Sequence, residues 1–378
     1  MTWPMVKLGG LVIAHYGKAL KKENRNESGI FDVYGSSGLV GKHDGALTYE
    51  STLIVGRKGS VGKIVWAENG GWVIDTAYYL QVLQPEKLDL RYLFYALKKA
   101  DLRSRTITTS IPGLNRDDFY GAVIPLPPLE EQKRIAAILD KADAIRRKRQ
   151  QAIQLADDFL RSVFLDMFGD PVTNPKGWEV KNIVELASSD KYSLKRGPFG
   201  GALKKEAFVD SGYLVYEQYH ALNNDFTFAR YFIDEEKYQE LKAFDVGEGD
   251  IIISCSGVNL GRLAIVPKGS PKGIINQALL KVKLDESKML NEMFVSIFTH
   301  PNFKREFFGD NRGSGVPNFP PMSTFKEFGF IVPPLEMQQQ YISLVHKVEQ
   351  LKVKVKNSCE LSDTEFNSLS QKAFAGEL

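Results

Sequence analysis

A glycine-rich stretch, GRKGSVGKI from Gly56 to Ile64, has the residue types of a phosphate-binding loop. A P-loop needs four residues between its glycines, then Lys followed by Ser or Thr, whose hydroxyl reaches a magnesium ion. In this chain five residues separate Gly56 from Gly62, and Ile64 replaces the hydroxyl residue. A similar stretch, SGVNLGRLA at 256–264, lacks both the lysine and the hydroxyl. The spacing therefore argues against a nucleotide site and favours a β-turn with glycine at positive φ.

Loops that combine basic, hydroxyl and planar side chains are candidate sites for contact with DNA. Arg and Gln suit paired hydrogen bonds to guanine and adenine edges, whereas Lys and Ser more often hold phosphates. Glycines beside them, as in VYGSSG at 33–38, permit a close approach. For each loop, an ordinary surface turn is the alternative. The candidates are Lys18, Lys21, Lys22, Tyr34, Ser36, Ser37, Arg57, Lys58, Ser60, Lys63, Arg103, Arg105 and Thr108, and then Lys195, Arg196, Lys204, Lys205, Gln218, Tyr219, His220, Asn259, Arg262, Arg312 and Ser314.

The residue patterns predict neither a catalytic site nor a metal site in this chain. The histidines are scattered, without HxH or HExxH spacing. No GxGxxG follows a predicted strand, and the Asn/Asp-Pro-Pro-aromatic motif of amino-methyltransferases does not occur. The acid pairs Asp117-Asp118 and Asp157-Asp158 are more typical of solvated helix faces than of general acid and base pairs.

Composition is that of an ordinary globular protein. The 378 residues suffice for two or three domains, with 43% hydrophobic and 25% charged residues. No apolar run approaches the roughly 18 residues that span a bilayer. The cysteines, Cys255 and Cys359, form no disulfide framework, which predicts a reduced, cytoplasmic location.

Charge is distributed unevenly along the chain. Net charge is +3, but residues 1–122 hold 16 Lys and Arg against 12 Asp and Glu, whereas residues 171–330 hold 20 of each. A protein that grips DNA alone by neutralising phosphates is usually more basic. If DNA is the ligand, we expect other subunits to supply much of the grip.

The elements that must position these loops follow from an internal repeat. PPLEEQ at 127–132 returns 206 residues later as PPLEMQ at 333–338. Upstream of each copy, the pattern predicts a strand, a glycine-rich turn, two more strands and a short helix. We therefore expect two tandem α/β (α+β) domains, each followed by a long helix, with a pseudo-twofold internal repeat. The expected boundaries are domain one at 1–124, a central spacer helix at 125–170, domain two at 171–330 and a C-terminal spacer helix at 331–378.

The two long helices should pair through apolar seams. Neither 129–168 nor 335–375 contains Gly or Pro, and apolar residues recur at steps of three and four, as in a coiled coil. Antiparallel pairing of helices roughly 45–57 Å long would act as a ruler between the domains. Ser358, Ser362 and Glu365 predict a more polar far half of the second seam, and the charges of 146–151 are expected to face partners. The expected seam core is Ile135, Ile138, Ile145, Leu344, Val348 and Leu351.

The chain resembles the specificity (S) subunit of type I restriction-modification systems along essentially its whole length. The resemblance rests on the order and duplication of several stretches: PLPPLEEQKRIAAILDKAD, VPPLEMQQQYISLV, FLRSVFLDMFGDPVTNPKGWE, and VYGSSGLVG followed by GRKGSVGKIVW. It implies a non-catalytic subunit in which each target-recognition domain reads one half of a bipartite DNA site. It also implies that the helices set the gap and dock two methyltransferase (M) subunits, that restriction (R) subunits join, and that S-adenosylmethionine, ATP and Mg belong to those partners. The first domain begins within about three residues of Met1, so any N-terminal anchoring segment is expected to be minimal.

Two other functions are open from the residues alone. A free-standing two-domain DNA-binding regulator would bind both half-sites unaided, and the near-neutral second domain and the lack of a helix-turn-helix signal argue against it. A nucleotide-using enzyme is disfavoured by the broken P-loop pattern.

Overall fold

The computed structural model describes residues 3–100, 102–104, 113–257, 259–309 and 319–377; for 359–363 it describes only the helical backbone. Four of the candidate DNA contacts lie outside the described residues: Arg105, Thr108, Arg312 and Ser314. The chain divides into two compact units. The first unit is Met1–Ile153 with Lys354–Leu378, and the second is Gln154–Val353.

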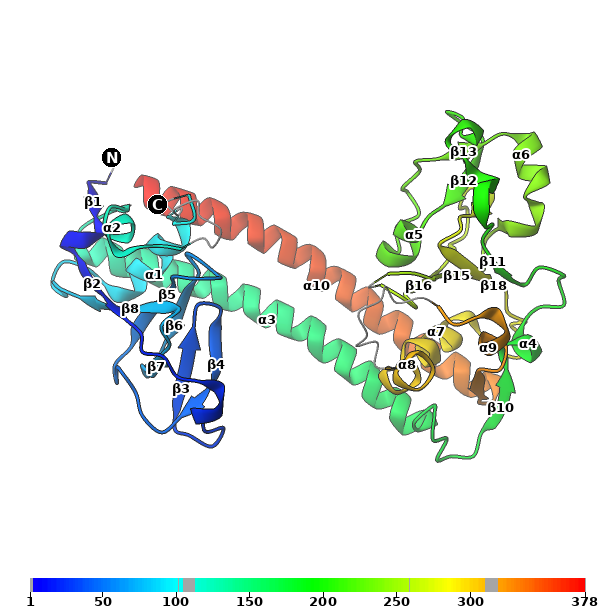
Figure 1. The fold of residues 1–378 in the computed structure, drawn as a ribbon, viewed down its shortest axis with the longest axis horizontal. Coiled ribbons are helices and arrows are strands. Elements are labelled where there is room, and N and C mark those ends of the chain that lie inside the picture. Colours follow the sequence, from blue (N-terminus) through cyan, green and yellow to red (C-terminus); the bar gives the residue numbers. More distant parts are fainter. Residues whose placement is uncertain (1–2, 101, 105–112, 258, 310–318, 378) are drawn as a thin grey trace. The chain divides into compact units, whose positions relative to one another are not determined.

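The first unit is built on two larger sheets and the two-stranded pair β1–β9 (Figure 1). An antiparallel sheet has the order β2 (Val12–Tyr16), β8 (Ala77–Val82), β5 (Thr52–Gly56) and β6 (Ile64–Ala67). A smaller sheet has the order β4 (Gly38–His43), β3 (Phe31–Gly35) and β7 (Trp72–Val73), with β3 and β7 parallel. The central strand β5 reads TLIVG and is buried throughout, because sheet neighbours flank it and helix α1 (Leu90–Lys99) lies against it. The remaining elements are β1 (Met5–Lys7), η1 (Leu8–Gly10), η2 (Lys22–Asn24), α2 (Arg116–Tyr120) and β9 (Val123–Pro125).

The second unit repeats this topology. Its antiparallel sheet has the order β11 (Leu194–Arg196), β18 (Leu279–Val282), β15 (Ile251–Ser254) and β16 (Leu263–Ile265). Its smaller sheet has the order β13 (Phe232–Ile233), β12 (Tyr213–Tyr216), β17 (Gly273–Ile275) and β14 (Asp245–Val246), again with one parallel pair. The pair β1–β9 also has a counterpart in β10 (Glu179–Asn182) with β19 (Gly329–Val332). The other elements are α4 (Ile183–Leu186), η3 (Gly200–Leu203), η4 (Lys205–Ala207), α5 (Gln218–Asn223), α6 (Glu235–Glu240), η5 (Lys242–Phe244), α7 (Asn291–Thr299), α8 (Pro301–Phe308) and α9 (Met322–Phe325).

Helices α3 (Leu129–Phe168) and α10 (Leu335–Ala375) run antiparallel within each unit, as expected (Figure 1). In the first unit Arg149 donates to the Ser358 carbonyl at 2.8 Å, and the Arg146 guanidinium lies 5.3 Å from the centre of the Phe366 ring. In the second unit Asp157 lies 2.7 Å from Lys352, and the Phe164 ring lies 5.6 Å from the Tyr341 ring. In each unit the partner's number falls as the α3 number rises, which defines the antiparallel direction.

The buried face of each long helix differs from the predicted seam. At several predicted positions the side chain that points inward belongs to the next residue in the sequence. On α3 the buried residues are Ile135 and Leu139, while the expected core residue Ile145 is 49% exposed. On α10 Val348 is buried as expected, but Leu351 is 59% exposed. The prediction of Ile145 and Leu351 as core is therefore wrong, whereas Ile138 and Leu344 are half-buried at its edge.

The shift also changes what packs at the far half of α10. The expected polar position Glu365 is exposed. The neighbouring Phe366, with Leu369 and Phe374, packs against the core of the first unit. Ala373 is fully buried, and its carbonyl accepts a hydrogen bond from the Trp3 indole at 2.9 Å. The end of the far half is thus anchored by apolar residues, contrary to the expectation at Glu365, whereas the Ser362 side chain lies outside the described part of the helix.

The glutamine that closes each PPLExQ repeat is a buried connector. Gln132 is 0% exposed; its Oε1 accepts from the Asp89 backbone N–H at 2.9 Å, and its Nε2 donates to the Lys87 and Pro127 carbonyls, both at 2.8 Å. These contacts join the first turn of α3 to the residues that precede α1. Burying an amide is favourable only when its hydrogen bonds are satisfied, as they are at this position.

The second copy makes the same connection with Gln338, which is also 0% exposed. Its Oε1 accepts from the Leu290 N–H at 3.0 Å, and its Nε2 donates to the Lys288 carbonyl at 3.2 Å and the Pro333 carbonyl at 2.8 Å. The repeated hexapeptide therefore docks each long helix onto its own domain.

Candidate nucleic-acid interface

Four loops of the first unit converge at one end of its main sheet. Lys63, from the β5–β6 turn, donates to the Ser37 carbonyl in the β3–β4 turn at 2.6 Å. The Ser36 backbone N–H donates to the Thr76 hydroxyl at 3.3 Å, and Lys58 forms an isolated β-bridge with Gly113. The structure thus gathers two stretches that the sequence analysis proposed separately, VYGSSG and GRKGSVGK.

The β5–β6 turn is a tight turn, as predicted. Gly59 and Gly62 have φ of 76° and 73°, a region that residues with a Cβ rarely adopt. Arg103 donates from Nε to the Val61 carbonyl at 3.3 Å, which adds its segment to the same cluster. Lys58, Lys63 and Arg103 are exposed, and Ser60 is half-buried.

Two residues that the sequence analysis missed belong to this cluster. The side chain of Tyr16, the last residue of β2, is 46% exposed. The guanidinium carbon of Arg116 lies 4.3 Å from the centre of the Tyr16 ring, and that of Arg57 lies 5.1 Å from it. Only the sheet topology brings residues 16, 57 and 116 together, so no local sequence signal could have found them.

The remaining candidates of the first unit differ in accessibility. Lys18, Lys21 and Lys22 are exposed, and Lys21 lies 3.5 Å from Glu23. Tyr34 is only 7% exposed, and its hydroxyl lies 3.4 Å from an Asp32 carboxylate oxygen. Burial and this acidic neighbour raise the pKa of Tyr34. The prediction that Tyr34 contacts DNA is therefore wrong, because its ring packs in a small core beneath the turn.

The second unit has an equivalent cluster at the β15–β16 turn. Gln218, at the start of α5, donates from Nε2 to the Ser254 hydroxyl and to the Ser256 carbonyl, both at 2.8 Å. Arg262 is exposed and donates to the Leu222 carbonyl at 3.3 Å. Asn259 is half-buried, and Tyr219 is 39% exposed.

His220 is a structural residue in this unit. It is 0% exposed; one ring nitrogen accepts from the Glu217 backbone N–H at 3.0 Å, and the other lies 3.0 Å from the Phe228 carbonyl oxygen. Both ring nitrogens are thus occupied, and the prediction that His220 contacts DNA is wrong.

Strand β11 brings basic residues to the same end of the second unit's antiparallel sheet as the β15–β16 turn. Arg196 ends the strand, its guanidinium carbon lies 5.4 Å from the centre of the Phe199 ring, and its buried Nε has no hydrogen-bond partner among the described residues. Lys195 is half-buried, with its ammonium 5.0 Å from the Phe244 ring. Lys204 and Lys205 are exposed.

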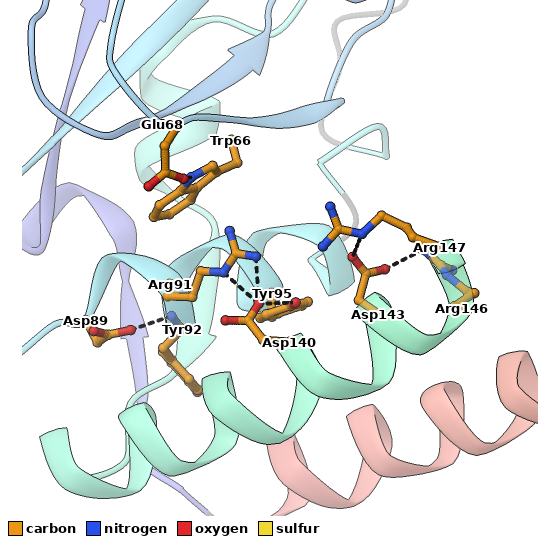
Figure 2. A network of polar contacts seen from close by, with 10 residues as sticks. All are labelled: Trp66, Glu68, Asp89, Arg91, Tyr92, Tyr95, Asp140, Asp143, Arg146 and Arg147. Atoms are coloured by element: carbon orange, nitrogen blue, oxygen red, sulfur yellow. Dashed lines mark hydrogen bonds and ion pairs between the residues drawn. The ribbon is translucent and has the colours of Figure 1, made fainter. Parts of the chain in front are cut away.

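A polar network fastens the first domain to α3 (Figure 2). Arg91 lies 2.6 Å from Asp140, Tyr95 donates to the same carboxylate oxygen at 2.6 Å, and the Arg91 guanidinium lies 4.5 Å from the centre of the Trp66 ring. Burial, followed by the hydrogen bond to Asp140, raises the pKa of Tyr95. Strand β6 of the antiparallel sheet, α1 and α3 are thereby joined through one guanidinium.

The second unit has a polar pair at the matching positions, with the acidic residue on the short helix and the basic residue type on the long helix. Glu292 takes the place of Arg91, and His346 takes the place of Asp140, with 3.5 Å between the imidazole nitrogen and the carboxylate oxygen. Both repeats therefore use a polar contact between short helix and long helix, but not the same one.

Not every residue of the basic run at 146–151 points to solvent. Asp143 is 6% exposed and pairs with Arg146 at 2.7 Å and Arg147 at 3.1 Å (Figure 2). Arg146 and Arg149 contact α10, as described above. The expectation that the whole run faces partners is wrong for these two arginines, because their long stems cover the helix pair.

The structure offers little for catalysis within the described residues. No group of three or more His, Cys, Asp or Glu side chains in that part of the chain could hold a metal ion. Burial raises the pKa of the Cys255 thiol to about 12, which keeps it protonated. Asp157 is 2.7 Å from Lys352 of α10, so it serves the helix pair. Across the described ranges, no helix combines the length and apolar content that crossing a bilayer requires.

These features define a tandem-repeat α/β protein with one basic, glycine-rich loop cluster in each repeat. The chain belongs to the family of type I restriction modification DNA specificity domains, whose profile matches residues 1–155 and 175–361.

Relatives and solved structures agree with this assignment. The chain is 26% identical over 241 residues to the type I restriction enzyme MjaVIII specificity subunit of Methanocaldococcus jannaschii, covering 58% of this chain and 54% of that protein. It is 23% identical over 319 residues to the MjaIX specificity subunit of the same organism, covering 78% and 70%. The aligned part thus spans about half of the first relative and more of the second.

Two solved structures share the fold. The S subunit of the type I restriction-modification system of M. genitalium superposes with a TM-score of 0.62 at 18% identity, covering 99% of this chain and 96% of that one. A chain from a study of complex assembly and conformational transition of the type I R-M system gives 0.55 at 15% identity, covering 100% and 98%.

Proposed function

We propose that this chain is the DNA sequence-specificity subunit of a type I restriction-modification complex. Each recognition domain binds one half of a bipartite double-stranded DNA site, and the spacer helices set the gap between the halves. The observation that carries the proposal is the duplicated loop cluster: each repeat gathers arginines at a sheet end, while its buried glutamine fixes the domain to a long helix.

The chemistry belongs to associated proteins. Two methyltransferase (M) subunits dock on the helices, and restriction (R) subunits complete the enzyme. S-adenosylmethionine, ATP and Mg are used by those partners, and the chain itself is non-catalytic and cytoplasmic. The domain boundaries near 124, 170 and 330 divide recognition from spacing.

The proposal is tested by co-expressing the chain with the methyltransferase subunit from the same organism and mapping methyladenine in the host genome. We expect one asymmetric motif with two specified halves and a fixed unspecified gap. Methylation at a single continuous motif, or none that depends on this chain, would overturn the proposal.

Exchanging the first recognition domain should change one half of that motif only. The exchange should cover residues 1–125, because β1 pairs with β9 from Met5–Pro125 to Lys7–Val123 and the two strands must travel together. Motif mapping before and after the exchange checks this expectation. A change in both halves would contradict independent reading by the two domains.

Exposed apolar residues on α3 are the proposed contact for an M subunit. Leu155 is 59% exposed and Phe159 is 49% exposed, and their spacing of four puts them on one helix face. Replacing both with Ser should reduce co-purification of the M subunit at least about 10-fold, because an interface loses its apolar anchors, and should change stability by no more than about 0.5 kcal/mol. Ile30→Ser, at a residue 78% exposed in the first recognition domain, is the matched control. Undiminished capture by the double variant would contradict this assignment.

A further inference from the structure

Tyr16, Arg57 and Arg116 come from three distant segments and meet beside the Tyr16 ring. We call these three residues the Tyr16 platform. Both guanidiniums lie within the roughly 6 Å at which a cation is attracted to a ring face, at 4.3 Å for Arg116 and 5.1 Å for Arg57. Tyr16 is 46% exposed, so the platform is accessible to a ligand.

Among the described residues, the two platform arginines have no carboxylate partner. Within the described residues, no carboxylate oxygen lies within 4.0 Å of the Arg57 or Arg116 guanidinium. By contrast, Arg91, Arg134 and Arg146 all have acidic partners. The Nε of Arg116 is buried without a hydrogen-bond partner among those residues. Two neighbouring cations repel, and the acceptors of a ligand would offset that repulsion.

Within the platform, Arg57 is held by several contacts. Arg57 donates from Nη1 to the Asp75 carbonyl at 3.1 Å and lies 5.8 Å from the Tyr78 ring. Its backbone N–H donates to the Thr76 carbonyl at 2.9 Å, and its carbonyl accepts from Leu114 at 2.9 Å. Both arginines are half-buried, whereas Lys18, Lys58 and Lys63 around them are exposed.

This difference separates two kinds of DNA contact. Flexible, exposed lysines suit phosphates, which need charge more than orientation. A planar guanidinium held by stacking and a backbone carbonyl suits two parallel hydrogen bonds to the N7 and O6 atoms of guanine. We infer that Arg57 and Arg116, stacked on Tyr16, read a guanine edge in the half-site bound by the first repeat; the inference rests on the proposed function.

The first test maps methyladenine motifs made by the whole complex carrying Arg57→Lys or Arg116→Lys. Lysine keeps the charge but loses the paired hydrogen bonds. We expect preference for one G·C pair in the first half-site to fall about 10-fold to 100-fold, while the second half and the gap stay unchanged. Arg230→Lys is the matched control, because Arg230 also lies over a tyrosine, 4.7 Å from the Tyr231 ring centre, and should leave the motif unaltered.

A second test uses the unaltered complex and so does not depend on how any variant folds. Each guanine of the first half-site is replaced in turn by 7-deazaguanine, which lacks the N7 acceptor. Methylation should fall about 10-fold or more at the guanine that the platform reads. The lysine variant should be insensitive to that same replacement.

Several results would overturn the inference. A first half-site without any G·C pair, tolerance of 7-deazaguanine at every position, or lysine variants that lower methylation equally at all sites would each exclude base reading by the platform. The last result would indicate phosphate contact. None of them affects the proposed function, which fails only if the wild-type chain directs no bipartite motif.

Discussion

Replacing Gln132 with Leu is expected to destabilise the first unit by about 3 kcal/mol or more. The substitution removes three hydrogen bonds and leaves the Asp89 N–H and the carbonyls of Lys87 and Pro127 without their partner. Each buried polar group that loses its partner costs roughly 1–3 kcal/mol. Gln338→Leu should have the same effect on the second unit, through Leu290, Lys288 and Pro333.

Native-state hydrogen exchange is the suitable measurement, because a two-unit chain need not unfold in one step. Exchange of the Asp89 amide should accelerate at least about 100-fold in Gln132→Leu, and that of the Leu290 amide should do so in Gln338→Leu. Gln151→Leu, at an exposed helix position, is the matched control and should change neither. If Gln132→Leu leaves the Asp89 amide protected, or Gln338→Leu leaves the Leu290 amide protected, the buried glutamine does not join helix to domain.

Deleting seven residues from α3, 142–148, is expected to keep both half-sites and change the gap between them. Seven residues are close to two helical turns, so the remaining side chains keep their faces, and the helix shortens by about 10 Å, close to three base pairs. The deletion removes Asp143 and Arg146 from the seam, so a companion variant should also lose the opposite segment of α10, 361–367.

Mapping methyladenine motifs for both variants checks this expectation. Deleting 142–146 serves as the control, because five residues rotate the helix faces by about 140° and should abolish assembly rather than shift the gap. An unaltered gap in the seven-residue variants, with methylation intact, would contradict a spacing role for the helices.

The duplicated architecture could be predicted because its signals are local. The absence of Gly and Pro over 129–168 and 335–375 matches α3 and α10, and the glycine-rich stretches mark the β5–β6 and β15–β16 turns. The phase of the seam could not be predicted. Ile138 and Leu139 are adjacent and both apolar, so the sequence permits two stripes from Ile135 onward. Contacts with α1 and α10 select Leu139, which is 0% exposed.

The residues of the candidate interface could be predicted only where basic or hydroxyl residues and glycines lie close together in the sequence. The basic turn around Arg57 and the loop at Ser36 meet as neighbours, but Tyr16 and Arg116 join them from distant segments through the sheet order. His220 was predicted to contact DNA because it lies in a polar segment. In the structure its side chain instead caps the N-terminus of its own helix, α5. Side-chain accessibility of this kind depends on tertiary packing, which short sequence patterns do not contain.

The pairs Arg91–Asp140 and Glu292–His346, which join the short helix to the long helix in each repeat, have a consequence for folding. If the first recognition domain met the wrong long helix, the cation Arg91 would face the imidazole of His346; in the converse error, Glu292 would face Asp140. Like charges would then meet, or an ion pair would be lost, at a contact where the buried glutamines alone could not tell the copies apart. We therefore expect these two pairs to disfavour docking of either domain on the wrong long helix, an effect that identical pairs in the two repeats would not provide.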